Sequence, residues 1–269
     1  MEGFDLNGKY ALVTGASSGI GKEISRCLAE EGAHLVLGSL PFEKEELEKW
    51  AAELAGRSKV RTWALAVDLS EDRGPETLYR MTREAVPHLD LLVNNAGVLA
   101  YGDFREISLA MHERLLRVNV RAYMILMYLA LQDMTERGQG RILNVSSMAA
   151  FQGTPYNATY GASKAFVQSL SEAVDLEVKQ KGVSILTLNP SITDTPMIKA
   201  YPNELSVYKL CKLRSPALTA RMAVDALKKG KPVCIPGTEN WILANVLPRV
   251  LPRGWMSRAG YRLLKKPGS

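Results

Sequence analysis

The chain has 269 residues, 46% of them apolar and 23% charged, so it can bury one substantial core. It contains no apolar stretch of about 18 residues, and residues 1–9 carry acids, so we expect neither a membrane-spanning helix nor a signal peptide. The three cysteines Cys27, Cys211 and Cys234 are odd in number and far apart, which argues against disulfides and zinc binding and favours a reducing, cytoplasmic location.

The net charge of +6 belongs to the C-terminal end of the chain. Six of the 34 basic residues and none of the 28 acidic residues lie in residues 241–269, so residues 1–240 carry 28 of each sign. A nucleic-acid-binding surface should place its positive charge on the folded body, so this distribution disfavours nucleic acid as a partner. We therefore treat residues 1–240 as one domain and residues 241–269 as a basic, apolar extension.

Short β-branched or leucine-rich runs alternate with longer helical patterns along residues 1–240. The runs predict strands at residues 9–14, 34–37, 60–67, 89–93, 141–145, 183–188 and 233–235, and the periodic stretches predict helices at 20–31, 43–54, 75–86, 109–136, 160–180 and 216–229. This alternation predicts an α/β fold, a Rossmann-like doubly wound parallel sheet of about seven strands with helices on both faces. Residues 191–214 are long for an irregular loop, so we interpret them as a candidate lid.

A glycine-rich turn joins the first strand to the first helix. It reads Thr14-Gly-Ala-Ser-Ser-Gly-Ile-Gly21, and its glycines let the backbone approach phosphates while the helix N-terminus offers free N–H groups. We expect the turn to bind the pyrophosphate of a dinucleotide through Gly15, Ser17, Ser18, Gly19 and Ile20. A glycine turn without a ligand is the alternative, because short glycine patterns are weak evidence.

The end of the second strand bears on the choice between NAD and NADP. The acid that usually binds the ribose 2′-hydroxyl of NAD at this position is missing, because residues 38–40 are Gly, Ser39 and Leu. An arginine for the 2′-phosphate of NADP is missing too, with Lys44 as a possible substitute, and we favour NADP(H) over NAD(H). After the third strand, Asp68 and Leu69 are placed to contact adenine, although Asp68 could instead cap the next helix.

Tyr160 and Lys164 form the candidate catalytic pair. Their i, i+4 spacing places both on one helix face, and a nearby ammonium lowers the pKa of a phenol, which makes Tyr160 a usable acid–base residue. Ser147 follows the fifth strand, at the sheet edge where open α/β folds bind ligands, so its hydroxyl and the phenol can meet on one substrate oxygen. A pair on a solvated helix and a serine in a loop turn are the structural alternatives.

Two asparagine-containing segments complete the candidate site. Asn95, Ala96 and Gly97 follow the fourth strand, where small residues let the backbone approach a cofactor. Asn119 interrupts an apolar helical stretch, and a buried asparagine needs hydrogen-bond partners. It is either satisfied by backbone groups or holds a water molecule in a proton relay.

Together these motifs resemble the short-chain dehydrogenase/reductase family over residues 6–237. The matching residues, all in the family's order, are TGASSGIG at 14–21, NNAG at 94–97, Asn119, Ser147 and YGASK at 160–164. The resemblance implies an NAD(P)-dependent oxidoreductase that transfers a hydride between nicotinamide and a carbonyl or secondary alcohol. It makes Tyr160 the acid–base residue and Lys164 the residue that lowers its pKa and binds the nicotinamide ribose. Ser147 would polarise the carbonyl, and Asn119 would support a water molecule.

The resemblance also implies cofactor contacts after the sixth strand and a multimeric protein. Pro190, Ile192, Thr193 and Thr195 fit the segment that holds the nicotinamide carboxamide, with Ser191 in place of the usual glycine. The helices at 109–136 and 160–180 commonly pair with a partner subunit in this family, so we expect a homodimer or homotetramer. A catalytically silent nucleotide-binding regulator or scaffold is the alternative, but such a protein has no need of the whole Ser–Tyr–Lys–Asn set.

The substrate and the C-terminal extension are characterised by their apolar content. The candidate lid favours a hydrophobic substrate through Met197, Ile198, Tyr201, Leu205, Val207, Tyr208 and Leu210. The segment from Trp241 to Trp255 mixes large apolar residues with arginines and two prolines. It could contact a membrane surface, pack over the substrate cleft or a second subunit, or form a solvated basic end, and the prolines break any long amphipathic helix there.

Overall fold

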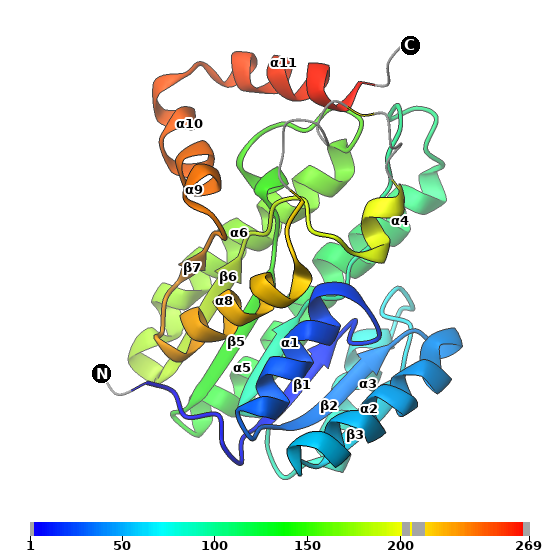
Figure 1. The fold of residues 1–269 in the computed structure, drawn as a ribbon, viewed down its shortest axis with the longest axis vertical. Helices are drawn as coiled ribbons and strands as arrows, with labels where there is room; N and C mark the ends of the chain where they lie inside the picture. The colour runs from blue at the N-terminus through cyan, green and yellow to red at the C-terminus, as the bar shows by residue number, and fades with distance from the viewer. Residues whose placement is uncertain (1–2, 201–204, 206–212, 266–269) are drawn as a thin grey trace.

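The computed structural model describes residues 3–200, 205 and 213–265, and its centre is a seven-stranded sheet (Figure 1). The strand order is β3-β2-β1-β4-β5-β6-β7, and every neighbouring pair is parallel. The strands are β1 (Tyr10–Thr14), β2 (His34–Ser39), β3 (Thr62–Ala66), β4 (Leu91–Asn94), β5 (Gly140–Val145), β6 (Val183–Leu188) and β7 (Val233–Cys234). The predicted doubly wound parallel sheet is confirmed, and the strand order reverses between β1 and β4.

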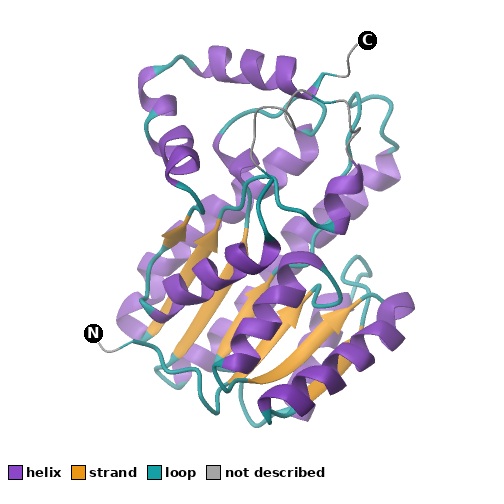
Figure 2. Ribbon diagram, viewed as in Figure 1, coloured by secondary structure: helices purple, strands orange, loops and turns teal. Residues whose placement is uncertain are grey.

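Helices cover both faces of this sheet (Figure 2). One face carries α1 (Gly19–Glu30), α2 (Lys44–Ser58) and α8 (Pro216–Lys228), and the other carries α3 (Gly74–Ala85), α5 (Tyr123–Glu136) and α6 (Ala158–Val178). The connections contain short 3-10 turns: η1 (Pro41–Glu43), η3 (Met148–Phe151), η4 (Lys179–Lys181) and η5 (Pro196–Ala200). The helix and strand ends lie within four residues of the sequence-based ranges, apart from the range 109–136.

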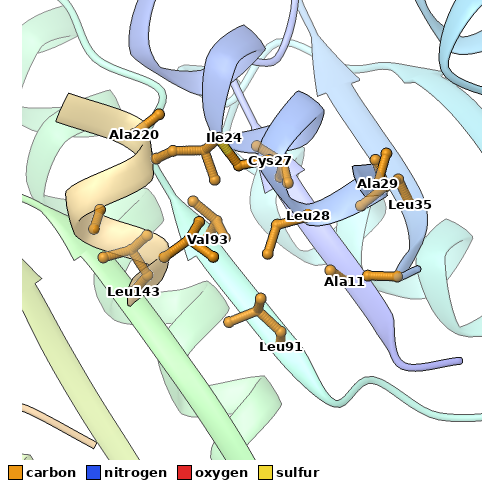
Figure 3. Close-up of a cluster of buried hydrophobic side chains, with 14 of the residues drawn as sticks. Ala11, Ile24, Cys27, Leu28, Ala29, Leu35, Leu91, Val93, Leu143 and Ala220 are labelled. Atoms are coloured by element: carbon orange, nitrogen blue, oxygen red, sulfur yellow. The ribbon is translucent and has the colours of Figure 1, made fainter. Parts of the chain in front are cut away.

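The two hydrophobic cores follow from the two-residue period of the strands. Val13 and Val93 point to the face covered by α1 and α8, whereas their neighbours Leu12 and Leu92 point to the opposite face. Figure 3 shows the first cluster, where Ile24 and other α1 side chains pack on β1, β2, β4 and β5 and against α8. Because both faces are buried, the central strands are almost entirely apolar, as their sequences suggested.

The predicted long helix at 109–136 contains a wide turn. It consists of α4 (Leu109–Leu116), a π-helical segment η2 (Arg117–Ala122) and α5, joined without leaving helical backbone angles. A π turn inserts an extra residue and is found mostly near functional sites. Periodicity did not reveal this insertion, because the apolar side chains continue through it. It carries Asn119 toward the edge of the sheet.

Three short helices, the first of which begins three residues before the expected extension, lie beyond the upper edge of the sheet in Figure 1. They are α9 (Thr238–Asn245), α10 (Leu247–Val250) and α11 (Arg253–Leu264). Pro248 and Pro252 stand at the two junctions, so the expected interruption of any long helix is observed. Within the part of the chain that the structure describes, no helix is both long enough and apolar enough to cross a membrane.

The two ends of the candidate lid are held together. Thr193 forms a parallel bridge with Arg214, and the Arg214 backbone N–H donates to the Ile192 carbonyl over 3.0 Å. Leu205, between them, is fully buried. Several residues expected to line the lid, namely Tyr201, Val207, Tyr208 and Leu210, lie outside the described residues, as does Cys211.

Candidate active site

An open groove lies at the carboxyl edge of the sheet, across the point where the strand order reverses. Its lining comes from the loops after β1, β2, β3, β4, β5 and β6 and from α6. Parallel α/β sheets bind ligands at this switch point, because neighbouring loops there diverge to opposite faces. We call the part near Ser17, Ser39 and Asp68 the β2 end of the groove, and the part near Tyr160 and Lys164 the α6 end.

The glycine-rich turn is shaped for close approach of a ligand. Gly15 and Gly19 have φ angles of +64° and +57°, which side-chain-bearing residues rarely adopt. A Cβ atom on Gly21 would lie 2.3 Å from both Asn95 Nδ2 and the Gly15 carbonyl oxygen. Ser18 starts α1 without a side-chain cap, so N–H groups of the first turn are free to bind an anion. These features fit a dinucleotide pyrophosphate.

Asn95 and Thr14 tie the loop after β4 to this turn. Thr14 Oγ1 accepts hydrogen bonds from the backbone N–H groups of Asn95 and Ala96 over 2.9 and 3.0 Å. Asn95 Nδ2 donates to the carbonyl oxygens of Thr14 and Gly15 over 2.9 and 3.1 Å. Asn95 therefore supports the turn, while Ala96 and Gly97 line the groove beside it. The organising role of Thr14 was missed from sequence, although it precedes the first glycine directly.

The β2 end of the groove contains both expected residues and an unexpected acid. Ser39, Asp68 and Leu69 line it as predicted. Asp68 Oδ1 accepts from Ser70 N and Oγ over 2.8 and 2.7 Å, and its Oδ2 lies 3.3 Å from Arg114 Nη2. The helix that follows begins at Gly74 with Arg73 at its N-cap, so the helix-capping alternative for Asp68 is not observed.

Glu43 is the acid that the sequence analysis missed at this end. Glu43 lines the groove, and its Oε2 accepts from Ser17 Oγ over 3.0 Å and from Leu40 N over 3.3 Å. It lies four residues past the end of β2, so inspection of the strand end alone did not find it. An acid that binds the adenosine ribose usually lies about 20 residues after the glycine-rich turn, and this spacing could have identified Glu43. Lys44, the possible phosphate partner, instead lies 3.8 Å from Glu48.

Ser147, Tyr160 and Lys164 meet at the α6 end, as the sequence predicted. The Ser147 hydroxyl lies near enough to the Tyr160 phenol to lower its pKa, and Ser147 also caps η3 by accepting from Ala149 N over 3.1 Å. Lys164 Nζ donates to the Val145 carbonyl oxygen over 2.8 Å and lies 5.9 Å from the centre of the Tyr160 ring. The phenol therefore lies at the carboxyl edge of the sheet and near the serine.

The pKa values in this cluster are governed mainly by burial. Burial raises the pKa of Tyr160, and the hydrogen bond with Ser147 partly offsets that increase. Burial also lowers the pKa of Lys164 to about 7. The sequence-based expectation that the ammonium sets a lowered pKa for Tyr160 is wrong in its net direction, because loss of hydration dominates. Lys164 is itself 3% exposed and donates to a backbone carbonyl.

Asn119 is satisfied by backbone groups, which is one of the two alternatives left open by the sequence. Its Oδ1 accepts from Val98 N over 2.8 Å, and its Nδ2 donates to Val98 O over 2.9 Å and to Ser163 Oγ over 3.2 Å. The side chain thus links η2 to the loop after β4 and to α6. A Cβ atom on Gly97 would lie 3.5 Å from Asn119 Oδ1 and 3.7 Å from Lys164 Nζ. The asparagine therefore holds this loop close to the lysine.

The segment after β6 is only partly at the groove. Pro190 and Thr195 line it, and the Thr195 side chain lies about 3 Å from where a Cβ atom on Gly19 would be. Ile192 and Thr193 do not appear in the lining; Thr193 is buried, and its Oγ1 donates to the Ser191 carbonyl oxygen over 2.9 Å. Cofactor contacts of Ile192 and Thr193 therefore stay a prediction.

Comparison with known proteins identifies this arrangement. Residues 9–206 match the family model for short chain dehydrogenases. The chain is 34% identical over 224 residues to the ketoacyl reductase HetN of Nostoc sp., covering 83% of this chain and 76% of the relative.

Among the solved structures that are similar to this chain, two examples were determined with nicotinamide cofactors. A short-chain dehydrogenase from Sphingobium yanoikuyae in complex with NADPH has a TM-score of 0.81 and 27% identity, covering 97% of this chain and 98% of the other. The 3-ketoacyl-(acyl-carrier-protein) reductase from Brucella melitensis, complexed with NADH, has a TM-score of 0.75 and 26% identity, covering 86% and 96%. The chain described here belongs to the short-chain dehydrogenase family, and it is an NAD(P)-dependent oxidoreductase.

Proposed function

We propose that Tyr160 transfers a proton to the oxygen of a carbonyl substrate while Ser147 positions that oxygen. The observation that carries the proposal is the position of Tyr160, which lines the α6 end of the groove with Lys164 and lies near enough to Ser147 for the serine hydroxyl to lower the pKa of the phenol. The bound nicotinamide supplies or accepts the hydride. In reduction, the carbonyl carbon gains the hydride and its oxygen gains the Tyr160 proton, which gives a secondary alcohol.

The proton on Tyr160 is replaced with the help of its neighbours. The raised pKa keeps the phenol protonated at neutral pH, and the Ser147 hydrogen bond stabilises the phenolate formed on proton transfer. Lys164, with a pKa of about 7, exists in both protonation states near neutral pH and can restore the phenol proton. We assign the binding of the nicotinamide ribose to Lys164 and the fixing of the adjoining loop to Asn119.

The decisive experiment is removal of the phenolic hydroxyl. Tyr160→Phe should lower kcat for ketone reduction by about 10²–10⁴-fold while NAD(P) still binds, because only the proton donor is lost. Tyr128→Phe is the matched control and should keep full activity, since Tyr128 on α5 is not part of the groove lining and phenylalanine preserves its apolar ring. Unchanged turnover in Tyr160→Phe would refute the assignment. Cofactor binding without turnover of any ketone by the wild type would favour the regulator or scaffold instead.

The substrate that this site supports best is a hydrophobic ketone or secondary alcohol. Val98, Val118 and Met197 contribute apolar lining to the groove, with Met197 in the segment expected to form the lid. The Nostoc relative is named a ketoacyl reductase, a name that fits a carbonyl on an apolar chain. Cyclic and long-chain ketones of graded length are therefore the first substrates to compare.

For the cofactor, two features of the β2 end oppose each other. The absence of an acid at residues 38–40 favours NADP(H), as the sequence analysis argued. Glu43 nevertheless places a carboxylate beside Ser17, where the adenosine ribose of a bound dinucleotide is expected. A carboxylate accepts hydrogen bonds from ribose hydroxyls and repels a 2′-phosphate. We propose that Glu43 decides the balance in favour of NAD(H).

We also propose that the protein is a homodimer or homotetramer in the cytoplasm. Large apolar side chains are exposed on the helical stretch α4–α5 and on α6, namely Leu116, Met124, Tyr128, Phe166 and Leu176. Pairing of these helices with a second copy would cover them. Cys27 and Cys234 are free thiols, which agrees with a reducing compartment. Light scattering of the purified protein tests the subunit number.

A further inference from the structure

The C-terminal helices expose an apolar surface of unusual density. Between Trp241 and Trp255 seven large apolar side chains are more than one-third exposed, with Val250 at 69% and Trp255 at 65%. We call these seven residues the tail surface: Trp241, Ile242, Leu243, Val246, Val250, Leu251 and Trp255. Monomeric proteins rarely leave so many large apolar side chains together in water without a binding role.

The charged residues from Trp241 to the C-terminus all have one sign, and the nearby acid Glu239 on α9 is paired with Arg214. Residues 241–269 contain six basic residues and no acid, whereas residues 1–240 are neutral overall. Arg249, Arg258 and Arg262 are exposed on α10 and α11. Apolar side chains mixed with tryptophan and cations are typical of segments that lie in the headgroup region of a membrane.

The opposite side of α11 is anchored to the catalytic domain. The Tyr261 ring stacks on Tyr156 with centroids 5.6 Å apart, and Tyr101 Oη donates to the Leu264 carbonyl oxygen. Gly260 is buried on the same side of the helix. Near α9, Arg214 pairs with Glu239. The tail helices are thus docked on the rest of the protein and lie at the outside of the fold (Figure 1), while the side chains of the tail surface stay more than one-third exposed.

Two occupants of the tail surface can be compared by charge. A second copy joined by a two-fold axis would bring the same basic segment against itself, which is unfavourable. An anionic lipid surface complements both the arginines and the apolar side chains. We propose that the tail surface docks the protein on the surface of an anionic bilayer, with the tryptophans at headgroup level and the chain not crossing the membrane.

Docking by this surface would bring the substrate side of the enzyme to the lipid. Besides Tyr101, α11 packs on the loop between Ser147 and Tyr160: Ser257 lies near Gly153, and the Tyr261 ring stacks on Tyr156. Tyr156 has a φ of +63°, a strained conformation for tyrosine, and its ring lies between those of Tyr101 and Tyr261. This step rests on the proposed function, because it would supply an apolar ketone from the membrane.

Vesicle co-sedimentation tests the docking without relying on catalysis. At low salt the protein should bind vesicles of 30% phosphatidylglycerol in phosphatidylcholine at least tenfold more strongly than pure phosphatidylcholine vesicles, and 0.5 M NaCl should weaken that binding. Arg249→Gln/Arg258→Gln/Arg262→Gln should reduce binding by about 10–100-fold. Trp241→Ser/Trp255→Ser should reduce it as well. Both variants should keep the ketone reductase activity of the wild type in solution.

A matched control removes three exposed arginines elsewhere. Arg57→Gln/Arg80→Gln/Arg105→Gln changes the net charge equally, but these side chains pair with Glu53, Glu84 and Asp103 on the catalytic domain. It should bind vesicles as the wild type does. Equal binding to neutral vesicles, or equal loss in both triple variants, would overturn the proposal. A tail variant that changes the subunit number in light scattering would point to a second copy instead. Tyr160→Phe should still bind vesicles, which separates docking from the catalytic assignment.

Discussion

The two ends of the groove differ in how their polar groups are placed relative to water. At the α6 end, Lys164 and Tyr123 are almost fully buried, and burial shifts the pKa values of Tyr123, Tyr160 and Lys164. At the β2 end, Ser17 and Glu43 form a polar contact on a turn, with no comparable cluster of buried ionisable groups. A site that moves a proton needs titratable groups away from water, whereas a site that selects a ligand needs complementary donors, acceptors and charges.

Lys164→Met tests this contrast, because the substitution should lower the activity and raise the stability of the protein. Activity should fall by about 10²–10⁴-fold, because the group that exchanges protons near Tyr160 is lost. Stability should rise. With a pKa of about 7 in the folded state against 10.5 ordinarily, the folded protein binds this proton less tightly than the unfolded chain. The unfavourable contribution of Lys164 to folding stability is therefore fully present below pH 7 and declines as the pH rises toward 10.5.

The variant should therefore gain about 1–3 kcal/mol over the wild type at pH 6, and clearly less at pH 9, in urea unfolding. The Val145 carbonyl keeps a donor in the variant, because Tyr123 Oη also donates to it over 3.2 Å. Lys49→Met serves as the control, since Lys49 is exposed and its removal uncovers no buried charge, so the variant should not gain this stability at pH 6. A gain in stability that is equal at pH 6 and pH 9 would mean that Lys164 does not titrate near neutrality.

Gly21→Ala should distort the glycine-rich turn, which lies between the two ends of the groove. The new Cβ would lie 2.3 Å from the Gly15 carbonyl oxygen and Asn95 Nδ2, so the glycine-rich turn must shift. We expect a loss of about 2–4 kcal/mol in unfolding free energy and at least tenfold weaker cofactor binding. Gly56→Ala is the matched control, because Gly56 lies within α2 with open space around its Cβ position, and it should stabilise slightly. Wild-type cofactor affinity in Gly21→Ala would contradict the assigned role of the turn.

The sequence predicted the α6 end better than the β2 end, for a physical reason. Tyr160 and Lys164 are four residues apart on one helix, so their spacing alone puts them together. Ser17 and Glu43 are 26 residues apart and meet only because η1 folds the chain back after β2. The net pKa direction of Tyr160 was also beyond sequence reasoning, since it depends on burial that only the packed sheet and helices create. The π turn that carries Asn119 was hidden by continuous apolar periodicity.

Glu43→Gln is the smallest change and tests the β2 end alone. Glutamine keeps an oxygen that can accept from Ser17 Oγ and Leu40 N, but it removes the charge that would repel a 2′-phosphate. We expect the dissociation constant of NADP⁺ to fall about tenfold and that of NAD⁺ to rise a few-fold at most, because about 1–2 kcal/mol of repulsion is relieved in this partly exposed site. Titration calorimetry with both cofactors measures the ratio directly. Glu45→Gln, an exposed neighbour, is the control and should leave the ratio unchanged. If the ratio of the two dissociation constants in Glu43→Gln equals that of the wild type, Glu43 does not contribute to cofactor selection. The absence of an acid at residues 38–40 would then govern the preference, in favour of NADP(H).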